Sequence, residues 1–254
     1  MKNSKAYLKI YNFIYRIKNN ISYLGFGRQC PICHHYVHMF APAGINKREN
    51  ARCIWCDSLE RHRLVWLFFQ RKTNLFDNQP KKMLHFAPEN AFVRPLSKYL
   101  GTGYITADLY NTAMVKIDIT NIQFPDDSFD VIFCSHVLEH IVDDVKAIRE
   151  LSRVLLNDGW ALIIVPITTK NTYEERTVIT PEKRLEVFGQ SDHVRRCGLD
   201  YKERLENNGF YVNEFCASDI ATEEEREYYG LRDDILFFCK KKISETIILG
   251  QISI

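Results

Sequence analysis

From Lys82 onward, short apolar runs alternate with segments that have helical spacing. The apolar runs are KMLHFA, GYITADL, MVKIDI, FDVIFCS and GWALIIVP, and helical patterns occupy residues 90–100 and 143–156. Strands that alternate with helices form a doubly wound α/β sheet, which binds its ligand across the carboxyl ends of the first strands. The pattern therefore predicts an α/β domain with a binding site at that edge.

The end of the chain departs from this alternation. A long polar stretch runs from Pro166 to about residue 198, and the helix DYKERLENNG and two strands, FYVNEFCAS and DILFFCKKK, follow it. Consecutive strands of this kind predict a C-terminal antiparallel hairpin on the edge of the sheet.

Two cysteine pairs precede the α/β pattern. CPIC contains Cys30 and Cys33, CIWC contains Cys53 and Cys56, and nineteen residues separate the pairs. Four thiolates at about 2.3 Å from one ion form a closed tetrahedral site with no open position for a substrate. The spacing predicts a small structural zinc-binding module, and reduced thiols at a coincidental spacing are the alternative. Three histidines are candidates to replace one ligand or to lie nearby: His34, His35 and His38.

The N-terminal fifth of the chain is basic. No acidic residue precedes Glu49, whereas eight lysines and arginines do. Residues 5–24 carry apolar side chains at helical spacing with lysines between them, which predicts a basic amphipathic helix. Such a helix packs on its own domain, or it contacts a membrane surface or nucleic acid.

These features predict four parts. They are a basic amphipathic helix over residues 1–28, a zinc-knuckle module with a connecting helix over 29–80, the α/β domain over 81–242, and a tail over 243–254. The apolar tail packs on the domain or on a second subunit. No apolar run approaches the roughly 20 residues that span a bilayer. The lysines among the first residues also argue against a secretory signal, so we expect a cytoplasmic protein.

Polar residues follow the predicted second, third and fourth strands. Asp108 ends the second strand about 20 residues after the turn that follows the first, a spacing at which a carboxylate accepts both hydroxyls of a cofactor ribose. Asp118 ends the third strand, and Ser135 and His136 follow the fourth. These positions favour a nucleotide-like cofactor at the carboxyl edge of the sheet.

The run DITNIQFPDDSFDVIFCSHVLEHIVDDVKAIRELSRVLLNDGW, residues 118–160, resembles the class I S-adenosylmethionine-dependent methyltransferases of the small-molecule, "type 11" kind. Their pattern is an acid, a PF-D-SFD strand entry, VLEH and E-x-x-RVLKPGG, and the similar region covers about residues 82–242. The resemblance implies a Rossmann-like methyltransferase fold with S-adenosylmethionine as cofactor. It also implies that Asp108 holds the ribose, that Asp118 holds the adenine amino group beside the Ile119 backbone, and that Ser135 and His136 lie near the methionine end.

The turn after the first strand differs from that family. The family usually has DxGxGxG, whereas this chain has MLHFAPENAF, with no glycine between Met83 and Phe92. Because glycines permit close backbone approach, this turn must either reach the cofactor through Ala87 and the Glu89 region or be unable to hold it normally. Glu89 is the candidate acceptor for the ammonium group of the cofactor. The alternative is a methyltransferase-like fold that has lost its cofactor.

Methyl transfer from a sulfonium requires alignment of the acceptor and, for a hydroxyl, one general base. His136 and His193 are the candidates, because a neutral imidazole accepts a proton near pH 7. His136 is alternatively a shape residue of the VLEH turn, and Glu139 and His140 are expected to cap or orient the next helix. The polar stretch 168–198 is either a solvated loop or an acceptor pocket for an acidic group, and the pocket would use Tyr173, Arg176, Arg184, His193, Arg195 and Arg196.

Three functions follow from these features. The first is an enzyme that methylates a hydroxyl or amine of a small molecule or glycan. The second is an RNA methyltransferase whose zinc module and basic N-terminus bind phosphates. The third is a non-catalytic binding protein on a methyltransferase scaffold.

Overall fold

The computed structural model describes residues 20–44 and 47–242. Most of the helix predicted over residues 1–28, and the whole tail over 243–254, lie outside the described residues. Within the N-terminal segment, Ile21–Tyr23 form a single 3-10 turn, η1. None of the described helices combines the length and the apolar character that crossing a membrane requires.

The structure divides into two compact units. Among the described residues, the first comprises residues 20–77 without 45–46, Asn90–Pro95 and Ala217–Asp233, and the second comprises Asn78–Glu89, Leu96–Cys216 and residues 234–242. The sequence predicts one continuous α/β domain over residues 81–242, whereas the structure groups two of its segments with the first unit. One reason is that helix α7 (Ala217–Ile220) packs against helix α2 (Glu60–Lys72), a contact between distant segments that no local pattern indicates.

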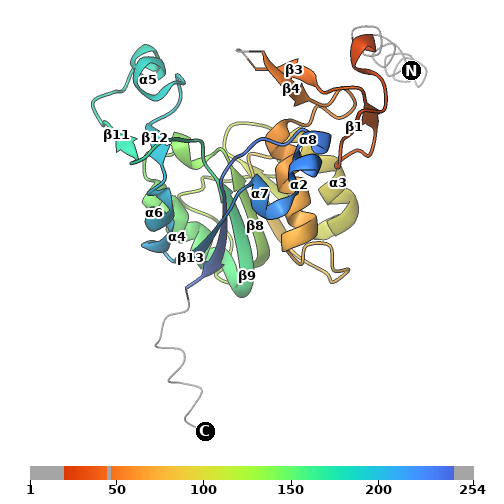
Figure 1. Ribbon diagram of the computed structural model, residues 1–254. Helices are drawn as coiled ribbons and strands as arrows, with labels where there is room; N and C mark the ends of the chain where they lie inside the picture. Colours follow the sequence, from red (N-terminus) through yellow and green to blue (C-terminus); the bar gives the residue numbers. More distant parts are fainter. Residues whose placement is uncertain (1–19, 45–46, 243–254) are drawn as a thin grey trace, which may run out of the picture. The chain divides into compact units, whose positions relative to one another are not determined.

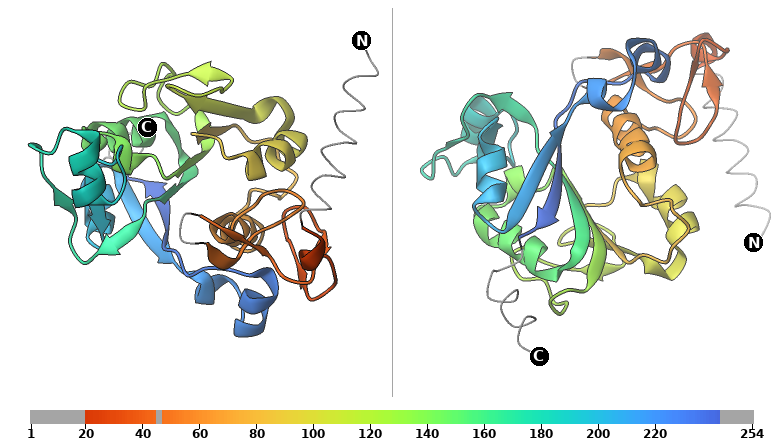
Figure 2. Two further views of the ribbon diagram at one scale, coloured as in Figure 1. Left: turned by 90° about the horizontal axis from the view of Figure 1, so that it is seen from above. Right: turned by 60° about the horizontal axis from the view of Figure 1, so that its bottom comes forward.

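The second unit is built on a mostly parallel sheet, as the alternating pattern predicts. Within the described residues its strand order is β13-β14-β9-β8-β5-β6-β7. The strands are β5 (Met83–Phe86), β6 (Tyr104–Asp108), β7 (Val115–Lys116), β8 (Phe129–Ser135), β9 (Leu155–Ile164), β13 (Phe210–Phe215) and β14 (Leu236–Lys241). Strand β14 runs antiparallel to both β9 and β13. The predicted hairpin is therefore confirmed at one edge of the sheet, where β13 and β14 are the long blue strands of Figure 2.

One face of this sheet is covered by helices α4 (Asp144–Val154) and α6 (Tyr201–Glu206), which Figure 1 shows on the same side of the strands. Alternate residues of the strands, such as Ile132 and Cys134 of β8, are buried against Ile148 and Leu151 of α4. Asp143 caps α4, because its side chain accepts a hydrogen bond from the backbone N–H of Lys146. The expectation that Glu139 or His140 caps this helix is therefore wrong, and both residues lie in the preceding 3-10 turn η3 (Leu138–His140).

The polar stretch after β9 has a structure of its own. Its elements are β10 (Ile167–Thr169), β11 (Tyr173–Glu174), α5 (Pro181–Phe188) and β12 (Arg195–Gly198). Figure 1 shows α5, β11 and β12 side by side. The three strands form a small sheet with β12 in the middle, parallel to β10 and antiparallel to β11. The sequence does not reveal this sheet, because strands of two to four polar residues carry no apolar alternation.

The first unit contains two short antiparallel pairs where the sequence indicates irregular chain. Strand β1 (Arg28–Gln29) pairs with β2 (Tyr36–Val37), and β3 (Ala41–Ala43) pairs with β4 (Arg48–Arg52). The predicted connecting helix is confirmed as α2. The unit also contains α8 (Glu223–Tyr229), and it shares α3 (Asn90–Leu100) with the second unit, in which the 3-10 turn η2 (Gly101–Gly103) follows that helix.

Candidate functional site

A cavity of about 740 Å³ opens in the second unit beside the carboxyl ends of β5, β6 and β8. That volume is within the range of small-molecule and cofactor sites. The polar side chains around it come from the strand ends, from the η3 region and from residue 192. They include Asp108, Asn111, Asp118, Thr120, His136, His140, Asp143 and Asp192.

Several residues chosen from the sequence meet at this cavity. Ala87, Asp108, Asp118, Ile119 and His136 all line it. Three other candidates are not among the lining residues: Glu89, which precedes α3, Ser135, which is buried at the end of β8, and His193, which is buried beside the lining residue Asp192.

Ala87 lies in the turn after β5, where the methyltransferase family usually has glycines and this chain has none. Its φ is +46°, in the left-handed region that favours glycine. Its N–H donates a hydrogen bond of 2.9 Å to the carbonyl of Ala107, which holds the end of β5 against β6. The turn therefore adopts a glycine-like backbone conformation without a glycine, and the methyl group of Ala87 is the only side-chain bulk that this residue brings to the cavity.

Asp108 is held rigidly at the end of β6. Its Oδ1 accepts hydrogen bonds from the N–H groups of Tyr110 at 2.7 Å and Asn111 at 2.6 Å. Burial acts to raise the pKa of Asp108, but the donors from Asn111 and Tyr110 outweigh it and hold this pKa below its usual value. The group is therefore an ionised acceptor at neutral pH, as a partner for two hydroxyls must be.

Asp118 is also fixed by local hydrogen bonds. Its Oδ1 accepts from the N–H of Thr120 at 2.8 Å and from the Thr120 hydroxyl at 2.9 Å. The neighbouring Ile119 side chain belongs to the core. The cavity thus presents two oriented carboxylates from adjacent strands of the sheet.

The η3 region places two histidines, His136 and His140, on the cavity lining, and Glu139 lies between them in the sequence. His136 has a φ of +54°, and its Nδ1 lies 3.2 Å from Oε1 of Glu139, whose side chain is only 1% exposed. The rings of His140 and His193 lie edge to face, 4.7 Å between centroids. Burial lowers the pKa of His193 and outweighs the nearby Glu139 carboxylate, which raises it, so the imidazole is neutral near pH 7.

Arg195 does not face an acceptor, contrary to the sequence-based hypothesis. The side chain is 2% exposed, and its guanidinium donates hydrogen bonds to the carbonyls of Leu138, Ile141 and Val142. It also pairs with Asp144 and Glu174. Arg195 therefore attaches the η3 region to the small sheet. The sequence does not indicate this role, because an arginine in a polar stretch is usually exposed.

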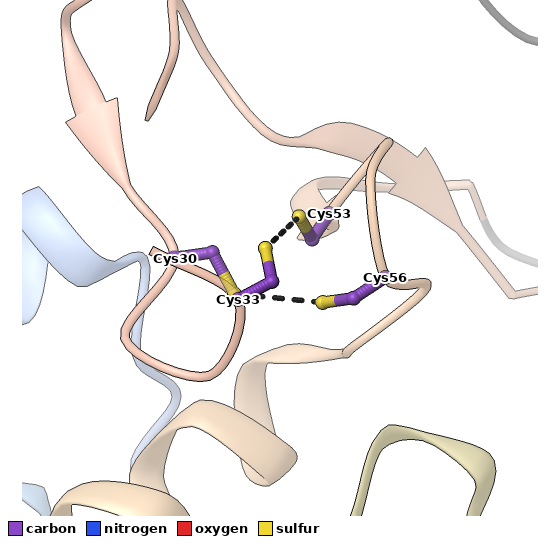
Figure 3. A group of neighbouring side chains, drawn as sticks. All are labelled: Cys30, Cys33, Cys53 and Cys56. Carbon is purple, nitrogen blue, oxygen red and sulfur yellow. Dashed lines mark hydrogen bonds between the residues drawn. The ribbon is translucent and has the colours of Figure 1, made fainter. Parts of the chain in front are cut away.

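The four predicted cysteines form a compact cluster in the first unit (Figure 3). Sγ of Cys30 lies 3.6 Å from Sγ of Cys56, and Sγ of Cys33 lies 3.8 Å from Sγ of Cys53. All four ligand atoms lie within 4.8 Å of one another. Tetrahedral thiolates at about 2.3 Å from one ion stand about 3.8 Å apart, so the donor set and its spacing fit a zinc ion. His34, His35 and His38 are not members of this cluster.

The two cysteine pairs have the same backbone structure. In the first, the N–H of His34 donates to the Cys30 carbonyl, and in the second the N–H of Asp57 donates to the Cys53 carbonyl. The φ angles of His34 and Asp57 are +60° and +59°. This repeated turn explains how two short segments direct both thiols of each pair toward one point.

Comparisons with known proteins agree with the architecture of the second unit. Residues 81–163 match the family model described as "Methyltransferase domain". Over 100 residues, 39% of this chain and 36% of the relative, the chain is 48% identical to the uncharacterized methyltransferase YcgJ of Bacillus subtilis. Over 48 residues, 19% of this chain and 21% of the relative, it is 40% identical to the uncharacterized protein MJ0638 of Methanocaldococcus jannaschii.

A solved structure is similar in fold. It is a S-adenosylmethionine-dependent methyltransferase from Mesorhizobium loti, with a TM-score of 0.50 and 13% identity over 70% of this chain and 98% of that chain. At this identity the likeness shows the fold. The chain spans about a third and about a fifth of the lengths of the two curated relatives. Residues 81–163 are thus similar to methyltransferase domains.

Proposed function

We propose that this protein is a S-adenosylmethionine-dependent methyltransferase that holds its cofactor in the 740 Å³ cavity. The observation that carries the proposal is the pair of fixed carboxylates, Asp108 and Asp118, at the carboxyl ends of β6 and β7. Asp108 binds the ribose hydroxyls, and Asp118 with the Ile119 backbone binds adenine. The Ala87 turn passes beside the methionine part of the cofactor, and Ser135 and Glu89 support it from outside the cavity lining.

The acceptor in this proposal is a hydroxyl or amine of a small molecule or glycan. Bound in the cavity, S-adenosylmethionine would supply the methyl group to the acceptor atom, and S-adenosylhomocysteine would be the product that leaves. His136 lines the cavity and takes the acceptor proton. His193 is buried outside the cavity lining, with its ring 4.7 Å from that of the lining residue His140, and acts through its neighbours.

The cysteine cluster is proposed as a structural zinc site. Its four thiolates leave no coordination position for a substrate, and the Sγ separations of 3.6 and 3.8 Å suit a tetrahedral ion. The ion would stabilise a segment with few strands and little core of its own.

RNA methylation is the alternative, favoured by the basic N-terminal residues, which would contact phosphates. Peripheral membrane contact by the same residues and a non-catalytic binding role are also open to test. A reducing, cytoplasmic location is part of the proposal, because none of the eight cysteines forms a disulfide.

Calorimetric titration of the zinc-loaded protein with S-adenosylmethionine tests the proposal. We expect micromolar binding that weakens at least about tenfold in Asp108→Asn, since one charge-assisted hydrogen-bond partner is worth roughly 1.5–3 kcal/mol. Asp158→Asn is the matched control, an exposed acid outside the cavity, and it should bind like the wild type. Absence of binding by the folded wild type would favour the non-catalytic scaffold. Salt-sensitive binding of RNA would favour the alternative acceptor.

A further inference from the structure

Glu139, His140 and His193 form a second group of potential metal ligands, separate from the cysteines. One carboxylate oxygen and one ring nitrogen from each histidine lie within 4.8 Å of one another. The group joins η3 to the segment that precedes β12, and His140 lines the same cavity as Asp108 and Asp118.

Only one of the two carboxylate oxygens of Glu139 has a hydrogen-bond partner within the described residues. Oε1 lies 3.2 Å from Nδ1 of His136, whereas Oε2 is buried without a hydrogen-bond partner. The side chain is 1% exposed, so solvent does not compensate this oxygen. Burying a carboxylate oxygen without a donor or a cation costs free energy, and a cation held between Oε2 and the two imidazoles would remove that cost.

The backbone holds the three residues in place independently of any ion. The N–H of Val194 donates to the carbonyl of Glu139 at 3.0 Å, which connects the His193 segment to η3. Buried Arg195 donates to the carbonyls of Leu138 and Ile141, on either side of the other two ligands. The cluster is therefore preorganised by main-chain contacts, as a metal site requires.

We propose that Glu139, His140 and His193 bind one divalent transition-metal ion in the wall of the cavity. Two imidazoles and one carboxylate suit zinc, manganese, cobalt or iron(II) better than magnesium or calcium, which prefer oxygen ligands only. Three protein ligands leave positions for water or an acceptor oxygen, in contrast to the closed cysteine site. His136, on the other oxygen of Glu139, orients the carboxylate.

The role of this ion rests on the proposed function. An acceptor hydroxyl bound to the ion loses its proton more easily, so the ion would select acceptors with a hydroxyl that reaches the cavity wall. Binding of the ion itself does not depend on that role.

Titration of the zinc-loaded full-length protein with cobalt(II) alone, without cofactor, tests the site. We expect one equivalent of cobalt to bind and to give weak visible bands. Thiolate-to-cobalt charge-transfer absorption should be absent, because it would show that cobalt had replaced zinc at the cysteine cluster. Binding should weaken at least tenfold in Glu139→Gln, His193→Gln and His140→Gln. His140 is partly exposed, so its variant is the one least disturbing to the fold, and the exposed His38→Gln is the control.

A wild type that binds no cobalt beyond the cysteine site, or variants that bind it as tightly as the wild type, would overturn the proposal. The separate titration with S-adenosylmethionine distinguishes the two hypotheses. Cobalt binding without cofactor binding would support the metal site and refute the proposed methyltransferase function. Cofactor binding without cobalt binding would refute only the metal site.

Discussion

Arg63 donates a hydrogen bond from Nη2 to the carbonyl of Gly230, 2.6 Å away, although the two residues are 167 positions apart in the chain. The same guanidinium donates to the carbonyls of Tyr229, Ala51 and Ser58, and it lies 3.7 Å above the ring of Phe40. Burial lowers the pKa of Arg63 to about 10, so the group remains charged at neutral pH. One side chain of α2 thus joins the end of the second cysteine pair to the end of α8.

We expect Arg63→Lys to destabilise the first unit strongly. An ammonium cannot reproduce the planar fork that serves several carbonyls, and buried carbonyls without donors cost about 1–3 kcal/mol each. The free energy of unfolding should fall by about 3 kcal/mol or more in urea denaturation. Arg71→Lys, at a partly exposed pair with Glu225, should cost less than about 1 kcal/mol. Equal effects of the two substitutions would contradict this role of Arg63.

Gly230→Ala should also destabilise the protein, for a steric reason. Gly230 has a φ of +57°, and an added Cβ would stand 2.6 Å from Cδ2 of Phe40. Gly189 also has a positive φ, +88°, but a Cβ there meets nothing within 4 Å. Gly189→Ala should therefore cost about 1 kcal/mol of conformational strain, and Gly230→Ala about 1–3 kcal/mol more. Thermal unfolding of both variants measures the difference, which should be absent if the Phe40 ring moves freely.

Cys53→Ser should abolish the proposed zinc site. We expect the zinc content, measured by mass spectrometry of the purified protein, to fall by one equivalent. The midpoint of thermal unfolding should fall by about 10 °C or more, because the binding free energy of a structural ion contributes to folding. Cys216→Ser is the control, since Cys216 is outside the cluster. If the zinc content of the Cys53 variant equals that of the wild type, the four cysteines do not bind zinc and are reduced thiols at a coincidental spacing.

Arg195 and Arg196 are adjacent on β12 but have different environments. Arg195 is buried between Asp144 and Glu174, and Arg196 is exposed. Removing one partner of a buried ion pair costs about 3–5 kcal/mol, so we expect Arg195→Met to lower the free energy of unfolding by that amount. Arg196→Met should change it by less than about 0.5 kcal/mol. Chemical denaturation measures both, and similar values for the two variants would refute the structural role of Arg195.

His136→Gln should separate catalysis from cofactor binding. If His136 is the general base, turnover of a hydroxyl acceptor should fall about 10²- to 10⁴-fold. Affinity for S-adenosylmethionine should stay within about threefold, because Asp108 and Asp118 are unchanged. Single-turnover kinetics and calorimetry measure the two quantities. Unchanged turnover would leave His136 as a shape residue of its turn.

Most of the α/β unit was predictable because its signals are local. Strands β5, β6 and β8 are short apolar runs followed by turn or helix patterns, and α4 lies within the helical pattern of residues 143–156. The cysteine cluster was predictable for the same reason, since two residues between cysteines already determine a turn. The antiparallel pairing of β13 with β14 followed from two consecutive strands.

The remaining features depend on contacts between distant residues. The sheet of β10, β11 and β12 gave no signal because its strands are short and polar, and its stability comes partly from buried Arg195. Residues 217–233 join the first unit through Arg63 and α2, which local patterns cannot indicate.

By itself, the sequence determined the alternating strands and helices, the two cysteine turns and the acids at the strand ends, because each depends on neighbours within a few residues. Only the tertiary structure decided that Glu139 and His140 meet His193, and that buried Arg195 of β12 holds the η3 region. These tertiary contacts depend on how the sheet and its connections pack. The free energy of that packing is distributed over residues that are far apart in the chain.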